Sequence, residues 1–176
     1  MPGCLALVVG PSGAGKDTLI RLAREALADD PRYVFPRRLV TRPPSADEDN
    51  DQIDEAAFAE GCAAGRFTLS WRAHGLGYAL PEAAGRLVAD GHVVVCNVSR
   101  RIVAEARAAG PPVSVVEITA PPEILAQRLA ARGRAEDGDL AARLAREGQV
   151  EPDVRILNTG APEEGAARLV AHLRGC

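Results

Sequence analysis

The chain has 176 residues, of which 47% are hydrophobic, and a formal net charge of −3. This length suits one domain with one core, and the acidic balance argues against general nucleic-acid binding, which needs a basic face. No apolar run approaches the ~20 residues that span a bilayer. We therefore expect a single cytoplasmic domain, residues 1–176, that binds neither nucleic acid nor membrane; its oligomeric state stays open.

The first pattern along the chain is a strand, a glycine-rich loop and a helix. Apolar residues predict a buried strand from Leu5 to Val9, and helical spacing predicts a helix from Gly15 to Leu27. The intervening Gly10, Gly15 and Lys16 have the spacing of a Walker A loop, whose backbone N–H groups and lysine bind nucleotide phosphates. Lys16, the only lysine of the chain, is the predicted catalytic residue here. The predicted ATP-binding residues are Gly10, Pro11, Ser12, Gly13, Ala14, Gly15, Lys16, Asp17 and Thr18.

The loop departs from the Walker A pattern at its last position. Asp17 stands where a serine or threonine hydroxyl usually binds Mg²⁺, and Thr18 follows one place late. A later apolar strand, His92 to Asn97, ends in an amide where kinases of this type often carry a metal-binding aspartate. We predict that Asp17 supplies the missing carboxylate to the metal, directly or through a metal-bound water. The open alternative is that Asp17 only complements the positive end of the helix dipole.

Beyond the loop, strand and helix patterns alternate along the chain. Apolar runs separated by amphipathic helices predict a parallel sheet covered on both faces, which is a doubly wound α/β P-loop kinase core. The further predicted strands are Tyr33 to Val40, Val93 to Asn97, Val113 to Ile118 and Val154 to Leu157. The further predicted helices are Pro81 to Ala89, Arg101 to Ala108, Pro122 to Ala131 and Pro162 to Leu173.

Two stretches interrupt this alternation. Residues 37–80 contain an acidic segment, a predicted helix from Asp54 to Ala64 and a short predicted strand from Phe67 to Trp71. Residues 128–146 are rich in arginine, alanine and acidic residues. In a small P-loop kinase these are the natural positions for an insertion that binds the acceptor and for a lid.

Arginines in both stretches suggest how two phosphates could be brought together. Donor and acceptor phosphates repel, so their approach requires positive charge from both sides. We predict that Arg37, Arg38 and Arg42 clamp the acceptor phosphate, and that Arg132 and Arg134 are catalytic residues that close over the γ-phosphate. Arg143 is a further lid candidate. The alternative is a solvated, ion-paired helix surface, which applies to Arg128, Arg132 and Arg143.

Two other residue types bear on the chemistry. An acceptor phosphate is already ionised and needs no general base, and neither His92 nor His172 is placed to act as one. This favours phosphorylation of a phosphate, although His74 could touch substrate in the acceptor region. The cysteines form no Cys-x-x-Cys pair and are predicted to be small packed residues, not disulfides or zinc ligands: Cys4, Cys62, Cys96 and Cys176.

Taken together, these motifs resemble the ribose 1,5-bisphosphate phosphokinases, a family related to guanylate kinases and found in bacterial phosphonate metabolism. The segments that carry the resemblance are 10–17, 39–43, 69–78, 97–100 and 128–134. The resemblance implies transfer of the γ-phosphate of ATP, with Mg²⁺, to the 1-phosphate of ribose 1,5-bisphosphate, giving 5-phosphoribosyl 1-diphosphate (PRPP) and ADP. The predicted acceptor-binding residues are Arg38, Thr41, Arg42, Ser70, Tyr78 and Arg100.

Two alternatives remain at this point. A guanylate or other nucleoside-monophosphate kinase shares Thr-Arg-Pro, a tyrosine like Tyr78 and the lid, but Leu69 or Ser70 stands where guanine needs a glutamate. Unpaired guanine N–H groups would cost ~1–3 kcal/mol. The acidic residues Glu48, Asp49 and Asp51 could bind ribose hydroxyls or be solvated. A non-catalytic interaction module on the same fold is opposed by the intact Gly-Lys of the loop.

Overall fold

A five-stranded parallel sheet forms the core of the computed structural model, which describes residues 2–44, 49–131 and 150–176. The strand order is β2-β7-β1-β8-β9, with every pair parallel. This arrangement confirms the predicted α/β class. The strands are β1 (Cys4–Val9), β2 (Tyr33–Val34), β7 (Val93–Asn97), β8 (Val113–Thr119) and β9 (Val154–Leu157).

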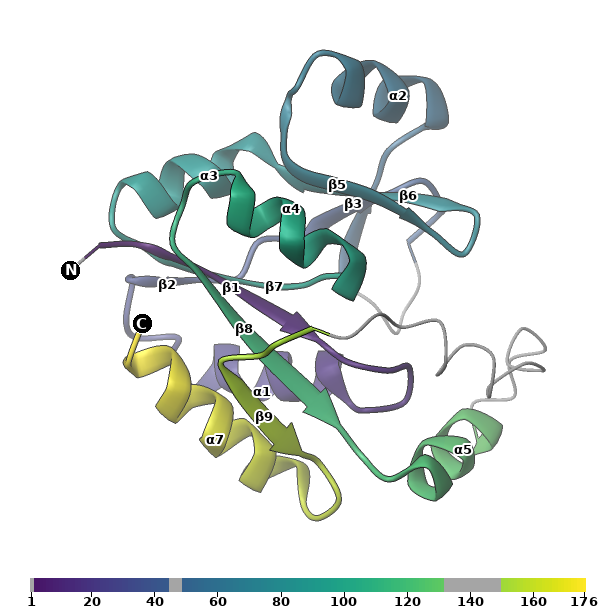
Figure 1. Ribbon diagram of the computed structural model, residues 1–176, viewed down its shortest axis with the longest axis vertical. Helices are drawn as coiled ribbons and strands as arrows, with labels where there is room; N and C mark the ends of the chain where they lie inside the picture. Colours follow the sequence, from purple (N-terminus) through teal and green to yellow (C-terminus); the bar gives the residue numbers. More distant parts are fainter. Residues whose placement is uncertain (1, 45–48, 132–149) are drawn as a thin grey trace.

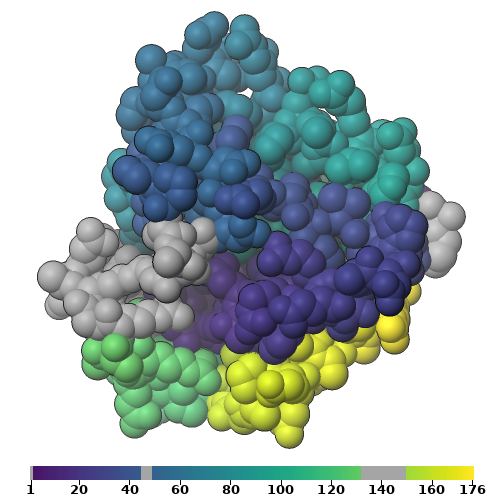
Figure 2. All heavy atoms as spheres, turned by 180° about the vertical axis from the view of Figure 1, so that it is seen from behind, coloured from purple at the N-terminus to yellow at the C-terminus, as the bar shows by residue number. Residues whose placement is uncertain are grey.

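Helices cover both faces of this sheet (Figure 1). The side chains of β1 show the division, because Ala6 and Val8 pack with α1 and α7, whereas Leu5, Leu7 and Val9 pack with α3 and α4. The space-filling view from behind places α1, in purple, between the blue insertion and the yellow C-terminal helix (Figure 2). The core helices are α1 (Lys16–Ala26), α3 (Glu82–Ala89), the short 3₁₀ helix η1 (Arg100–Ile102), α4 (Val103–Ala108), α5 (Pro122–Ala131) and α7 (Pro162–Arg174).

A second, four-stranded sheet makes up the predicted insertion and projects from the core in Figure 1. Its strand order is β4-β3-β6-β5, and helix α2 packs against β5 and β6. Trp71 and Tyr78 stack face to face on neighbouring strands, with ring centroids 5.5 Å apart. The elements are β3 (Arg38–Val40), β4 (Asn50–Gln52), α2 (Glu55–Ala63), β5 (Phe67–Ala73) and β6 (Leu76–Pro81).

The predicted strand from Tyr33 to Val40 is wrong as a single element. Its first part is β2 in the core sheet, and its last part is β3 in the insertion sheet. Pro36 lies in the break and has no N–H for a sheet ladder. The predicted helix over 101–108 is split into η1 and α4, and the strands β4 and β6 were not predicted.

The remaining predicted helices, including that over 54–64, agree with the structure to within one residue at each end. Asp54 accepts a hydrogen bond from the Ala57 backbone N–H and thereby caps α2. Within the described part of the chain, every helix is too short or too polar to cross a bilayer.

Candidate active site

Three glycines give the loop between β1 and α1 its shape. Gly10, Gly13 and Gly15 have φ angles of 149°, 85° and 90°, which side-chain-bearing residues rarely adopt. A Cβ on Gly10 would lie 1.9 Å from the carbonyl oxygen of Ile118, and one on Gly15 would lie 2.5 Å from Nδ2 of Asn158. The loop is therefore pressed against the end of β8 and against the segment that follows β9.

The backbone carbonyls of this loop are held by side chains. The Lys16 ammonium donates to the carbonyl oxygens of Gly10 and, at 3.3 Å, Pro11. Arg128 donates through Nη1 to Gly13 at 3.1 Å, and Asn158 donates through Nδ2 to Ala14 at 2.8 Å. These partners satisfy the backbone carbonyls of the loop and fix its turn.

Arg128 and Asn158 also hold each other, because Arg128 Nη2 donates to the Asn158 carbonyl oxygen at 2.7 Å. The sequence assigned Arg128 to a lid or a solvated surface, but in the structure its side chain extends from α5 to the carbonyls of the nucleotide loop. Asn158 was missed. The available signal was its position, since it follows an apolar strand just as Asn97 ends one. The structure shows that Asn158 is buried.

Asp17 and Asn97 meet beside the loop, a contact that the sequence analysis did not predict; the metal-binding role of Asp17 stays a prediction. Asn97 Nδ2 donates to Asp17 Oδ1 at 2.9 Å. The contact arises because β1 and β7 are neighbours, with Val8 opposite Asn97 at the carboxyl edge where α1 begins. Mg²⁺ is commonly held by one or two carboxylates together with substrate phosphates, so the Asp17 carboxylate next to Lys16 fits such a site. Among the described residues, no three His, Cys, Asp or Glu side chains gather to form a metal site by themselves.

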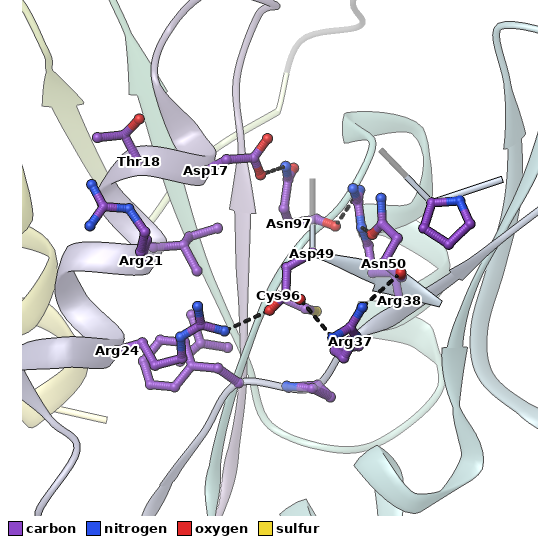
Figure 3. Close-up of a pocket in the computed structure, with 15 residues that line it drawn as sticks. Asp17, Thr18, Arg21, Arg24, Arg37, Arg38, Asp49, Asn50, Cys96 and Asn97 are labelled. Atoms are coloured by element: carbon purple, nitrogen blue, oxygen red, sulfur yellow. Dashed lines mark hydrogen bonds and ion pairs between the residues drawn. The ribbon is translucent and has the colours of Figure 1, made fainter. Parts of the chain in front are cut away.

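A cavity of about 470 Å³ opens beside this pair, between α1 and the insertion (Figure 3). Its walls carry four arginines but only two acids, so positive charge prevails there. Cys96 also lines the cavity, and burial raises the pKa of its thiol to about 12, which keeps it protonated. The charged lining residues are Asp17, Arg21, Arg24, Arg37, Arg38 and Asp49.

Arg38 is the most enclosed of these cations. Its Nε donates to Asn50 Oδ1 and its Nη1 to the Asn97 carbonyl oxygen, both at 3.1 Å, while its guanidinium lies 5.4 Å from the ring centroid of Tyr78. Within the described chain, its hydrogen bonds thus reach only neutral oxygens. Burial lowers the pKa of Arg38, and the Asp17 charge partly opposes this shift. An enclosed cation with neutral acceptors is suited to a bound anion.

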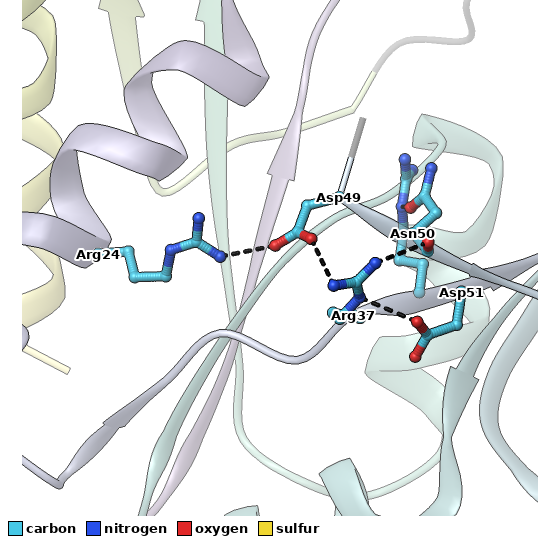
Figure 4. A network of polar contacts seen from close by, with 6 residues as sticks. Arg24, Arg37, Asp49, Asn50 and Asp51 are labelled. Atoms are coloured by element: carbon cyan, nitrogen blue, oxygen red, sulfur yellow. Dashed lines mark hydrogen bonds and ion pairs between the residues drawn. The ribbon is translucent and has the colours of Figure 1, made fainter. Parts of the chain in front are cut away.

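Arg37, in contrast, belongs to an ion-pair network that connects α1 to the insertion (Figure 4). Asp49 accepts from Arg24 at 2.7 Å and from Arg37 at 3.0 Å, and Arg37 also pairs with Asp51 at 3.0 Å. These side chains are about half exposed, and exposed pairs contribute only ~0–1 kcal/mol each. The network engages Asp49 and Asp51, two of the three acidic residues that the sequence analysis proposed as contacts for ribose hydroxyls.

Other predicted acceptor residues lie on the insertion but outside the lining of this cavity. Thr41 Oγ1 accepts from the Gly77 N–H at 2.8 Å and so ties the end of β3 to β6. Arg42 directly follows β3, Ser70 is half-buried on β5, and Tyr78 is buried on β6. Their substrate roles stay predictions.

Arg100 lies instead on the core, at the start of η1. It pairs with Glu117 of β8 at 3.8 Å. The predicted lid and catalytic arginines, and one predicted acidic contact, lie outside the described residues: Arg132, Arg134, Arg143 and Glu48.

The structure also places the three histidines. His92 contacts the Leu87 carbonyl oxygen through Nδ1 at 3.1 Å, and His172 contacts Ser114 Oγ through Nε2 at 2.7 Å. Neither lines the cavity. His74 lies in the turn between β5 and β6 with a φ of 53°. The cavity wall therefore includes no histidine that could serve as a general base.

Comparisons with known proteins give four informative matches. A family model described as an AAA domain matches residues 5–149. Ribose 1,5-bisphosphate phosphokinase PhnN of Methylobacterium radiotolerans is 85% identical over 176 residues, covering 100% of both chains. The protein of that name from Rhodopseudomonas palustris is 52% identical, covering 98% of this chain and 89% of its own. A crystal structure of guanylate kinase from Anaplasma phagocytophilum has a TM-score of 0.70 at 20% identity, over 99% of this chain and 86% of that chain, which shows the shared fold.

The anchoring of the loop gives a testable expectation. Asn158→Ala removes the shorter of the two hydrogen bonds to the Ala14 carbonyl oxygen and leaves only that of Arg128 at 3.4 Å. A lost buried hydrogen bond costs about 1–3 kcal/mol, so the KM for ATP should rise at least about tenfold. Arg128→Ala should act in the same direction. In the double variant, the free-energy cost of ATP binding should be smaller than the sum of the costs in the two single variants, because both side chains support one loop. Arg155→Ala, an exposed change on β9, is the control, and equal KM values for it and Asn158→Ala would contradict the anchoring role.

Proposed function

We propose that this chain, which belongs to the ribose 1,5-bisphosphate phosphokinase family of AAA-domain proteins, transfers the γ-phosphoryl group of ATP to the 1-phosphate of ribose 1,5-bisphosphate. The products are 5-phosphoribosyl 1-diphosphate and ADP. The observation that carries the proposal is 85% identity over the full length to a relative of that name. The arginine-lined cavity next to the nucleotide loop supports it, because this acceptor carries two phosphates.

The chemistry relies on positioning and charge. The attacking oxygen belongs to an ionised phosphate, so no side chain has to remove a proton. Lys16 now donates to loop carbonyls and would exchange them for the β- and γ-phosphate oxygens of ATP. Bound Mg²⁺ neutralises charge on the transferred group, and the Asp17 carboxylate, oriented by Asn97, would help to hold it.

On the acceptor side, Arg38 is the residue best placed to bind a phosphate. Its guanidinium is held by the carbonyl oxygen of Asn97, whose side chain holds Asp17, so acceptor and metal sites share one support. We propose that further residues of the insertion and of η1 contact the acceptor. We also propose that Arg132 and Arg134 of the lid are catalytic. The further acceptor contacts proposed are Thr41, Arg42, Ser70, Tyr78 and Arg100.

Guanine is disfavoured as the recognised group. Leu69 is buried and Ser70 half-buried on β5, and neither offers a carboxylate to the guanine N–H groups. Asp49 and Asp51 are already ion-paired with arginines. A sugar phosphate fits these residues better, because its phosphates need cationic side chains and it has no base that a carboxylate would have to recognise.

The acceptor is tested by ADP formation with ATP, Mg²⁺ and either ribose 1,5-bisphosphate or GMP. We expect turnover with the ribose bisphosphate and little with GMP. Lys16→Ala, which removes the ammonium from the phosphate loop, should reduce kcat at least about a hundredfold. Turnover with GMP alone would overturn the acceptor assignment, and no turnover with either would overturn the proposed activity.

The proposed metal role of Asp17 can be tested by exchanging the carboxylate of Asp17 and the amide of Asn97. Asp17→Asn should raise the Mg²⁺ concentration required for half-maximal rate at least about tenfold, because the only carboxylate of the pair is lost. The swap Asp17→Asn with Asn97→Asp restores one carboxylate and one amide at the same contact and should recover part of the loss. If Asp17→Asn left the Mg²⁺ requirement unchanged, Asp17 would serve the helix dipole only.

Arg38 and its neighbour Arg37 form a matched pair for testing acceptor binding. Arg38→Ala removes the enclosed cation and should raise the KM for ribose 1,5-bisphosphate at least about tenfold, with a smaller effect on the KM for ATP. Arg37→Ala removes a half-exposed cation from the Asp49 network and should change the acceptor KM less than about threefold. The reverse order of the two effects would contradict the role of Arg38.

A further inference from the structure

Two cysteines far apart in the sequence meet on the side of the core away from the nucleotide loop. Cys4 is the buried first residue of β1, and Cys176 is half-buried just after α7. Figure 1 shows the start of β1 and the end of α7 on the same side of the molecule. Cys4 lies on the same face of β1 as Ala6 and Val8, and Cys176 packs against the core cluster that contains those two residues. The two thiols are hydrogen bonded to each other. Both are unbridged thiols in this structure.

The surroundings give the two sulfurs different reactivity. The hydrogen bonds from Cys4 and Ser114, with the nearby His172 charge, lower the pKa of the Cys176 thiol despite its partial burial. Ser114 Oγ and His172 Nε2 are themselves 2.7 Å apart, and the Cys176 thiol also contacts the His172 carbonyl oxygen at 3.7 Å. The contact with Cys176 and burial raise the pKa of Cys4. Cys176 is also the more accessible sulfur, because it is half-buried whereas Cys4 is buried, so peroxide reaches Cys176 first.

We propose that Cys4 and Cys176 are a peroxide-sensitive thiol pair that closes into an intramolecular disulfide. In the first step, the Cys176 thiolate attacks hydrogen peroxide, the O–O bond breaks, and the departing hydroxide is protonated to water. This leaves Cys176 as a sulfenic acid. In the second step, the Cys4 sulfur attacks the Cys176 sulfur, the S–O bond breaks, and the departing hydroxide takes the Cys4 proton. Two thiols and one peroxide thus yield one disulfide and two waters.

The position of the bond determines its consequence. It would join the first residue of β1 to the segment after α7, the helix that packs on α1. Neither cysteine lines the cavity or contacts the nucleotide loop. A cross-link between segments so distant in sequence restricts the unfolded chain over almost its whole length. We therefore expect oxidation to raise the melting temperature and to leave kinase turnover unchanged.

The test treats the reduced, full-length protein with hydrogen peroxide and then alkylates the remaining thiols for mass spectrometry. The expected result is a linked peptide pair containing Cys4 and Cys176, reversed by dithiothreitol, with Cys62 and Cys96 still alkylated. Cys62→Ser, which removes the exposed cysteine, is the matched control and should leave the bridge intact. Cys176→Ser should abolish both the bridge and the rise in melting temperature.

A second variant keeps the proposal testable if the bridge is slow. In Cys4→Ser, the Cys176 sulfenic acid has no resolving thiol, so dimedone should label Cys176 more strongly than in the unaltered protein. Circular dichroism checks that this variant is folded. The proposal is overturned if Cys4 remains fully alkylatable after peroxide treatment, or if Cys62 or Cys96 reacts in preference to Cys176.

Discussion

The site depends on one constraint: side chains from distant parts of the chain must hold the turn of the loop between β1 and α1. Arg128 and Asn158 hold the later carbonyls of the loop, and Lys16 holds the first ones until it turns to the phosphates. The glycines allow the turn, but Asn158 also makes Gly15 necessary, because a Cβ there would meet its amide nitrogen at 2.5 Å. Hydrogen bonds therefore join the loop to α5 and to the residue that follows β9.

On the other side of the loop, one chain of contacts links Asp17, the end of β7 and the insertion. Asp17 is held by the side chain of Asn97, and the backbone of Asn97 holds Arg38 of the insertion. A shift of the insertion would therefore also move the Asp17 carboxylate, which we propose binds the metal. The ion pair between Arg24 and Asp49 also joins α1 to the insertion. Both side chains are half-exposed, so this ion pair is weak.

The sequence predicted the local parts of this site and missed the distant ones. The loop and its two flanking elements followed from glycine spacing and apolar periodicity. The sequence also singled out Asp17 and Asn97, but not the hydrogen bond between them. Arg128 and Asn158 reach the loop across 115 and 144 residues, a separation that no local pattern reports. β4 (Asn50–Gln52) was missed because its residues are polar and it pairs with β3 alone. These errors concern pairing between elements, which periodicity along one segment does not encode.

The central claim is that the protein joins phosphate to phosphate by positioning charges, without a general base. Phosphorus-31 NMR of the reaction mixture with ATP, Mg²⁺ and ribose 1,5-bisphosphate tests this claim most directly, because it identifies the new bond. The account predicts a pair of mutually coupled diphosphate resonances on carbon 1 of the sugar, growing together with ADP while the 5-phosphate resonance persists. A new phosphomonoester on a sugar hydroxyl, or release of inorganic phosphate alone, would contradict it.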